Sequence, residues 1–268
     1  MSTLKNAVYK YLPPSRADIF EVKSIRFTQP VLFNDPFESK PHLTYGLTLE
    51  EIKQALSKSW SEYGWSTEAV REFENSVSRE FLEDFSSLSY DHHEEIYDNI
   101  GSNIGVLSLT EKCNNLLMWA HYAQSHEGFV IGFDPSHHFF SSRKNDGQIG
   151  ELQKVRYSNE RPKKSINSVS LFDVYLTKSK EWEYEQEFRL LRHLDTADTK
   201  FPVEPYPVCL FKLPPSCIRS VLFGCRMNDT VRDRILSTLK SDADYSHVQT
   251  SRMIVSRDTY EIFTGSLR

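Results

Sequence analysis

The stretch "NLLMWAHYAQSHEGFVIGF" (residues 115–133) is predicted to fold as a short helix that leads into a buried strand. The helix is predicted over 114–124 and the strand over 128–133, where every residue is apolar or glycine. Packing accounts for Trp119 and for the apolar strand. Packing alone could also place Tyr122 in the core and leave the histidines at the rim. The alternative is a site, for which we expect His121 and Tyr122 to face a cleft, with the strand anchoring their helix.

Alternating or continuous apolar runs elsewhere predict a strand-rich chain with few regular strand–helix repeats. This pattern is typical of an α+β domain rather than of a doubly wound parallel sheet. We expect mixed or antiparallel sheets. Further strands are predicted at 7–12, 25–30, 104–110, 150–158, 187–193, 206–213, 218–224 and 251–263.

The predicted helices are gathered mainly in one polar block. Residues of about 48–100 read as a helical insertion that opens with Thr48 as N-cap and Glu51 as its capping-box partner. Shorter helices are expected at 17–23, at the start of 170–186, and at 230–240. The chain contains no repeat and no Pro/Gly/Ser linker, so we expect one domain over residues 1–268 with this insertion inside it.

The composition predicts a soluble cytoplasmic protein. The chain has 268 residues and a net charge of −5, and no apolar run approaches the ~20 residues of a membrane helix. No signal peptide is recognisable, and the four cysteines read as reduced thiols. They show neither CxxC nor Cys/His zinc spacing, so no metal is expected, and the negative charge argues weakly against a general nucleic-acid binder.

The segment "KSKEWEYEQEFRLLR" (178–192) is the strongest candidate for chemistry. If it is extended, Glu185 and Glu187 project from one face together with Arg189, because side chains two apart share a face of a strand. Such paired carboxylates suit acid–base chemistry. The alternative is a solvated edge strand whose acidic face is balanced by nearby lysines and arginines.

Two weaker signals lie elsewhere in the chain. Ser108 and Thr110 stand two apart on a predicted strand, so their hydroxyls face one way, although this spacing is common in sheets. In the segment 34–38, Asn34-Asp35-Pro36 is strong turn chemistry, and the turn also carries Glu38. The turn is either a purely structural Asx turn or a polar clamp for a ligand.

Several motifs in order resemble those of one bacterial family, the domain-of-unknown-function family number 2971. They are "YKY", "IRF", "FNDPFE", "SLT", "LLMWAHYAQSHEGFVIGFD", "VRY", "LTKSKEWEYEQEFRLL" and "IRSVLFG". The resemblance runs from Tyr9 to about Gly224, with the helical block as its variable part. The family name carries no activity.

The order of an aromatic and basic first strand, a Ser-x-Thr strand and Glu-x-Glu before a late strand is also similar to ADP-ribosyltransferases. That resemblance implies a split-sheet core and NAD as co-substrate. It assigns dinucleotide binding to Lys10 or Tyr11, ordering of the site to Ser108 and Thr110, nicotinamide stacking to Tyr122, and the grip on the nicotinamide ribose to Glu187. The first strand lacks the His or Arg usual in that group, and Arg26 is a candidate substitute.

Three functions therefore remain open from the sequence. The first is an ADP-ribosyltransferase-like transferase or NAD glycohydrolase, a toxin or phage-defence effector, with Glu185 handling an unknown protein or nucleic-acid acceptor and with Asn34 and His121 at the ligand. The second is a non-catalytic binding module with a degenerate cleft. The third is a metal-dependent nuclease using Asp35, Glu38, Glu185 and Glu187.

Overall fold

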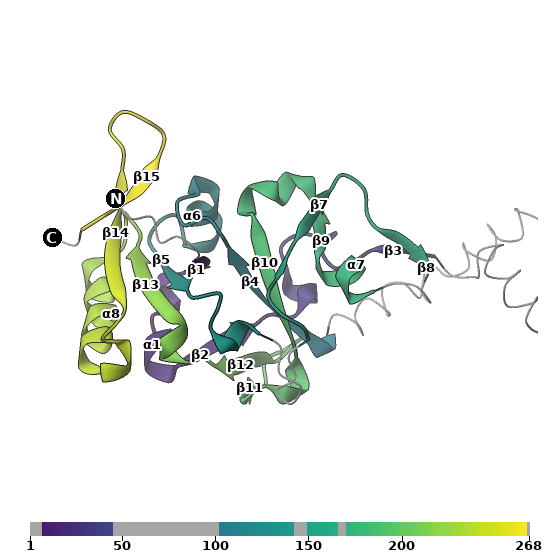
Figure 1. The fold of residues 1–268 in the computed structure, drawn as a ribbon, viewed down its shortest axis with the longest axis horizontal. Helices are drawn as coiled ribbons and strands as arrows, with labels where there is room; N and C mark the ends of the chain where they lie inside the picture. Colours follow the sequence, from purple (N-terminus) through teal and green to yellow (C-terminus); the bar gives the residue numbers. More distant parts are fainter. Residues whose placement is uncertain (1–6, 45–101, 142–148, 166–169, 267–268) are drawn as a thin grey trace, which may run out of the picture.

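The computed structural model describes residues 7–44, 102–141, 149–165 and 170–266, and the predicted helical insertion lies outside them. An eight-stranded sheet forms the centre (Figure 1). Its neighbours are antiparallel except for β13 and β14, which are parallel. In order, its strands are β15 (Ile262–Gly265), β14 (Gln249–Val255), β13 (Ile218–Phe223), β5 (Phe129–Phe133), β1 (Val8–Leu12), β4 (Ile104–Thr110), β10 (Glu187–His193) and β6 (Gln153–Lys154).

Three smaller sheets complete the strand structure of the described residues. One is antiparallel, with the order β11 (Thr199–Phe201), β12 (Val208–Lys212) and β2 (Ser24–Phe27). The other two are parallel pairs, β3 (His42–Thr44) with β8 (Lys163–Ser165) and β7 (Arg156–Ser158) with β9 (Thr177–Ser179). Mixed and antiparallel sheets with few helices confirm the predicted α+β class.

Helices cover both faces of the central sheet, as the alternation along β5 shows. Phe129, Ile131 and Phe133 join the larger apolar cluster with residues of α1 and α8, whereas Val130 joins a second cluster with Trp119 of α6. The α-helices are α1 (Ile19–Val22), α6 (Leu116–Tyr122), α7 (Leu171–Tyr175) and α8 (Asp229–Ser241), and α8 begins at an Asn228 cap that accepts from the Thr230 N–H. Short 3-10 helices are η1 (Pro14–Arg16), η2 (Pro30–Leu32), η3 (His138–Phe140), η4 (Lys180–Glu185), η5 (Leu194–Thr196), η6 (Pro215–Cys217) and η7 (Ala243–Tyr245).

Three predicted segments differ from the structure. The strand expected at 150–158 is divided into β6 and β7, which join different sheets, and the segment 251–263 turns back as a hairpin rather than continuing as one strand. The helix expected at the start of 170–186 is only the five residues of α7, followed by β9 and η4. Each break occurs where the chain changes the strands or helices against which it packs. The hydrophobic periodicity of the sequence does not report such changes.

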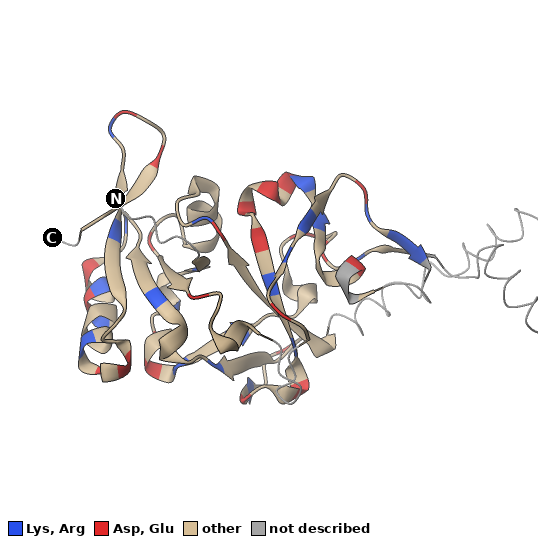
Figure 2. Ribbon diagram, in the orientation of Figure 1, with Lys and Arg blue, Asp and Glu red and all other residues tan. Residues whose placement is uncertain are grey.

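Charges are interspersed on the outer helix α8, where acidic and basic residues alternate (Figure 2). At η4 and β10, by contrast, charged residues are clustered, and Glu residues form ion pairs with Lys and Arg. Among the described helices, none has the length and apolar character that crossing a bilayer requires.

Candidate functional site

The central sheet separates between β1 and β4, and the separation forms a cavity. The two strands pair at one register position, Tyr9 with Thr110. Further along β4, Val106 pairs instead with Thr28, which donates to and accepts from it at 3.0 and 2.9 Å. The intervening edge of β4 therefore faces a cavity of about 360 Å³ rather than a strand. A gap of this kind leaves backbone polar groups for side chains or ligands to satisfy.

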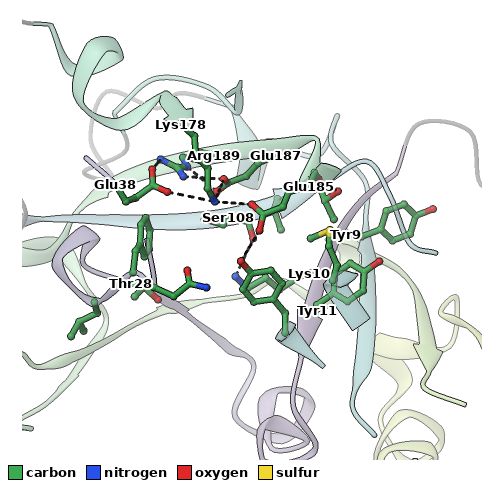
Figure 3. A pocket seen from close by; sticks show the side chains of 17 residues that line it. Tyr9, Lys10, Tyr11, Thr28, Glu38, Ser108, Lys178, Glu185, Glu187 and Arg189 are labelled. Atoms are coloured by element: carbon green, nitrogen blue, oxygen red, sulfur yellow. Dashed lines mark hydrogen bonds and ion pairs between the residues drawn. The ribbon is translucent and has the colours of Figure 1, made fainter. Parts of the chain in front are cut away.

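Most of the residues predicted to bind or react do line this cavity. The strands that carry them, β1, β4 and β10, are neighbours in the sheet, and η2, α6 and β9 close the sides. Figure 3 shows Glu38, Lys178, Glu185, Glu187 and Arg189 gathered on one wall, with Lys10 apart from them. The predicted residues found there are Lys10, Tyr11, Asn34, Ser108, Thr110, Tyr122, Glu185 and Glu187.

Two predicted residues lie elsewhere. Arg26 is on β2, where it pairs with Leu210 of β12, and it does not line the cavity. His121 is exposed and does not face the cleft as expected. Successive residues of a helix point about 100° apart, so Tyr122 takes the inward direction and its neighbour points outward.

Glu187 is held by a buried ion-pair network. Arg189 donates from Nε and Nη2 to the two carboxylate oxygens of Glu187 at 2.8 and 2.9 Å, and Lys178 adds a third donor at 3.1 Å. Arg189 also pairs with Glu38 at 2.8 Å. Burial raises the pKa of the Glu187 carboxyl, but the charges of Arg189 and Lys178 outweigh burial and hold this pKa at about 2. Glu187 is thus a permanent anion at the cavity wall.

Glu185 also belongs to this ion-pair network, but it does not lie on an extended strand as expected. It ends η4, and Gln186 adopts a left-handed conformation with φ of 46° before β10 begins. Lys178 donates to one oxygen of Glu185 at 2.7 Å and the Tyr122 hydroxyl donates to the other at 2.6 Å. Glu185 and Glu187 are buried, so the alternative of a solvated acidic edge strand is wrong.

Lys10 lies across the cavity from this network (Figure 3), and its Nζ donates to the Ser108 carbonyl at 3.0 Å. It therefore bridges the two separated strands. Burial lowers the pKa of Lys10 to about 8, although the charges of Glu187 and Glu185 act in the opposite direction. A lysine with a lowered pKa that faces carboxylates across a cavity is a candidate functional group.

The lowered pKa of Lys10 predicts a pH dependence of stability. The folded state releases this proton near pH 8 and the unfolded state near ~10.4, so the unfolded state binds more protons between these values. The free energy of unfolding of the wild type, relative to Lys10→Met, should therefore rise as pH increases from 8 to 10. Urea unfolding at both pH values measures it. The exposed Lys200, changed to Met, is the matched control, and a flat or falling difference for Lys10 contradicts the prediction.

Helix α6 divides its side chains between core and cavity. Trp119 is fully buried and donates from Nε1 to the Cys113 carbonyl at 2.9 Å, whereas Tyr122 lines the cavity. Both placements confirm the expectation from the sequence. Thr110 is a positioning residue, because its hydroxyl donates to the Glu185 carbonyl and accepts from the Lys112 N–H.

The turn at 34–38 is both structural and part of the site. Asp35 Oδ1 accepts from the Phe37 N–H at 2.9 Å, which confirms the predicted Asx turn. The same turn places Asn34 and Glu38 in the cavity wall. Glu187 lies close to this turn, since Glu38 and Glu187 share Arg189 and Lys178.

The sequence placed Arg189 on the same face as the two glutamates, but Lys178 was expected only as one of the balancing charges. The i, i+2 spacing of Glu187 and Arg189 was the sequence pattern that could have predicted the ion pair between them. No local pattern links Lys178 to Glu38, because their contact spans the chain. In the described part of the chain, no group of three His, Cys, Asp or Glu side chains has metal-holding geometry.

Comparisons with known proteins find a match to one family model and no activity. Residues 118–190 match the model of a family described as "Protein of unknown function (DUF2971)". The matched segment runs from α6 into β10, and it confirms the family predicted from the motifs. No curated protein and no solved structure matches the chain.

Proposed function

We propose that this protein is an ADP-ribosyltransferase-like enzyme that binds NAD in the cavity between β1 and β4 and cleaves its nicotinamide–ribose bond. The carrying observation is that Glu185 and Glu187 are buried side by side in the wall of that cavity, opposite Lys10. The adjacency of β1, β4 and β10 supports the proposal, because these strands carry the three motifs that resemble this enzyme group.

Glu187 supplies negative charge to the reaction. Loss of nicotinamide develops positive charge on the ribose, and a fixed anion stabilises that charge as in glycoside cleavage. With its pKa near 2, Glu187 stays ionised throughout the physiological range. Arg189 and Lys178 hold its orientation, so little reorganisation is needed when the ribose charge appears.

Glu185 is the better candidate for proton transfer. Among the described residues, Tyr122 donates to one of its oxygens and Lys178 donates to the other, whereas a carboxylate offers about four acceptor positions. An acceptor hydroxyl or water can donate to a remaining position. Glu185 then takes that proton as the acceptor oxygen bonds to the ribose carbon and nicotinamide leaves with the bonding pair.

The remaining cavity residues suit a dinucleotide. Lys10, protonated below pH 8, places positive charge where a pyrophosphate can bind, and the Tyr122 ring offers a face for nicotinamide. Tyr11 contributes its ring, since its hydroxyl donates to the Lys112 carbonyl. In a bacterial cytoplasm this activity suits a toxin or phage-defence effector, with a protein or nucleic acid as acceptor.

The nuclease alternative gains little from the same geometry. Glu38, Glu185 and Glu187 do converge, but Lys178 contacts all three and Arg189 contacts two of them. Each of these carboxylates thus already has a cationic partner, with which a metal ion would have to compete. A binding module without catalysis needs the same cavity, and only turnover separates it from an enzyme.

Free nicotinamide released from NAD is the measurement that tests the proposal. We expect release by the wild type and a loss of about 10²–10³-fold in Glu187→Gln, the usual cost of removing a preorganised electrostatic group. Glu183→Gln is the matched control, because it removes an exposed carboxylate four residues earlier and should leave the rate unchanged. Melting temperatures verify that both variants are folded.

The outcomes separate the hypotheses. NAD binding by the wild type without nicotinamide release supports a binding module and rejects catalysis. Equal losses in the two variants reject the assigned role of Glu187. Release accompanied by labelling of a macromolecule from ³²P-NAD defines a transferase, whereas release alone defines a glycohydrolase.

A further inference from the structure

A second cavity of about 250 Å³ lies behind the wall of the first. It is bounded by the turn at 35–41, the segment 158–162 and β9. Glu38 and Lys178 line both cavities, so their ion pair, at 3.5 Å, belongs to the partition between them. This second cavity plays no part in the proposed NAD reaction.

Three oxygen atoms of residues lining this cavity are buried without a hydrogen-bond partner among the described residues. They are Asp35 Oδ2, Ser39 Oγ and Thr177 Oγ1. Asp35 is only 6% exposed, and its other oxygen is used by the Phe37 N–H. A buried polar atom left unsatisfied costs roughly 1–3 kcal/mol, and more when it is charged. Three in one cavity indicate a site that a ligand completes.

The lining cations do not neutralise Asp35. No described residue forms an ion pair with Asp35. Lys178 is directed to Glu38, Glu185 and Glu187, and Arg161 donates from Nε and Nη2 to the Lys40 carbonyl. The lining atoms without a partner are therefore one carboxylate oxygen and two hydroxyls, and Asp173 adds a further carboxylate to the lining. This set favours a ligand which donates hydrogen bonds and carries positive charge.

The backbone at Ser39 supports a built site. Ser39 has φ of 57°, in the left-handed region that non-glycine residues seldom adopt. Such strain persists where the surrounding structure imposes it, and it concentrates at ligand sites. Here it falls on a residue that lines the cavity and carries one of the three unpartnered oxygens.

We infer that this second cavity binds an organic cation through an ammonium or guanidinium head group, with Asp35 as its counter-ion and Ser39 and Thr177 as hydrogen-bond acceptors. A guanidinium has five N–H donors and an ammonium has three, so either can meet all three oxygens. The cavity is smaller than a drug-sized pocket, which suits a head group rather than an extended ligand.

Isothermal titration with agmatine, which carries both head groups, tests the inference on the full chain without NAD. We expect saturable binding by the wild type and at least a tenfold weaker affinity in Asp35→Asn. That variant keeps an acceptor for the Phe37 N–H, so the turn should persist, as its melting temperature verifies. Glu160→Gln is the matched control, because Glu160 lines the same cavity but is exposed.

Three results would overturn the inference. One is the absence of saturable agmatine binding, which means that water alone fills the cavity. The second is an equal loss of affinity in the Asp35 and Glu160 variants, which indicates nonspecific attraction. The third is equal binding of glycerol, which indicates a neutral hydroxyl site. None of these results bears on nicotinamide release, and a failure of that reaction leaves this site untouched.

Discussion

Replacing Arg189 with methionine is expected to lower the free energy of unfolding by about 3–5 kcal/mol, the usual cost of removing one partner from a buried ion pair. The Arg189 side chain is completely buried and contacts Glu187 and Glu38. Methionine fills much of the volume but leaves two buried carboxylates with Lys178 as their shared cation. The loss is therefore electrostatic more than steric.

The same variant should show a defined pH dependence. The pKa of Glu187 is about 2 in the folded protein and ~4.3 in an unfolded chain. Its stabilising contribution is complete above pH ~4.3 and is lost as pH falls toward 2. Without Arg189 the folded-state pKa rises, so the difference between wild type and variant should be largest at neutral pH and shrink in acid.

Urea unfolding at pH 7 and pH 4 measures both effects. The double variant Arg189→Met, Glu187→Gln should recover part of the loss, because it removes one of the uncompensated charges. A cost below 1 kcal/mol at pH 7, or no recovery in the double variant, would show that the network contributes little to folding. Lys212→Met is a suitable control, since Lys212 is an exposed partner of Asp198 at 3.9 Å.

Trp119→Ala is expected to destabilise the protein by about 3–5 kcal/mol, as removal of a large buried aromatic usually does. Trp119 is fully buried, and its ring meets Tyr11 edge-on at a centroid distance of 5.3 Å. It also stacks on His126 at 6.2 Å and donates to the Cys113 carbonyl. The substitution opens a void between α6 and β1 and leaves that carbonyl without its donor.

Tyr122→Phe is the comparison that separates packing from function on α6. It keeps the ring and loses the hydroxyl that donates to Glu185, so we expect a smaller loss of about 1.5 kcal/mol. It should nevertheless reduce NAD turnover, because Glu185 loses a positioning contact. Chemical unfolding and nicotinamide release distinguish the two variants. If Tyr122→Phe unfolds the protein as severely as Trp119→Ala, the helix is purely a core element.

Local sequence patterns were sufficient to predict several of the strands and helices. The strands at 104–110 and 187–193 were predicted with their observed limits, and the helix behind Asn228 begins at its cap. In these cases the alternation of apolar residues or a side-chain cap reports directly on backbone conformation. The inward direction of Tyr122 and the burial of Trp119 followed from the same reasoning.

Only the tertiary structure determined what surrounds the two glutamates. Lys178 of β9 pairs with both glutamates, and Arg189 of β10 pairs with Glu187. Glu38, from a turn far away in the sequence, shares both of these cations. The same applies to the separation of β1 from β4. It arises because β4 pairs with Tyr9 of β1 at Thr110 but with Thr28 at Val106. Periodicity describes one strand at a time and does not specify where two strands stop pairing.

The sequence alone therefore indicated the α+β class and the family resemblance, because the order of the elements and the motifs can be read locally. The residues that it named for the cavity came mainly from the resemblance to ADP-ribosyltransferases. The sequence did not determine whether Glu185 and Glu187 are solvated or buried. A carboxylate can be buried only where cations and donors meet it, and those groups come from distant segments that the folded chain brings together. That meeting of distant charges, rather than any local motif, defines this site.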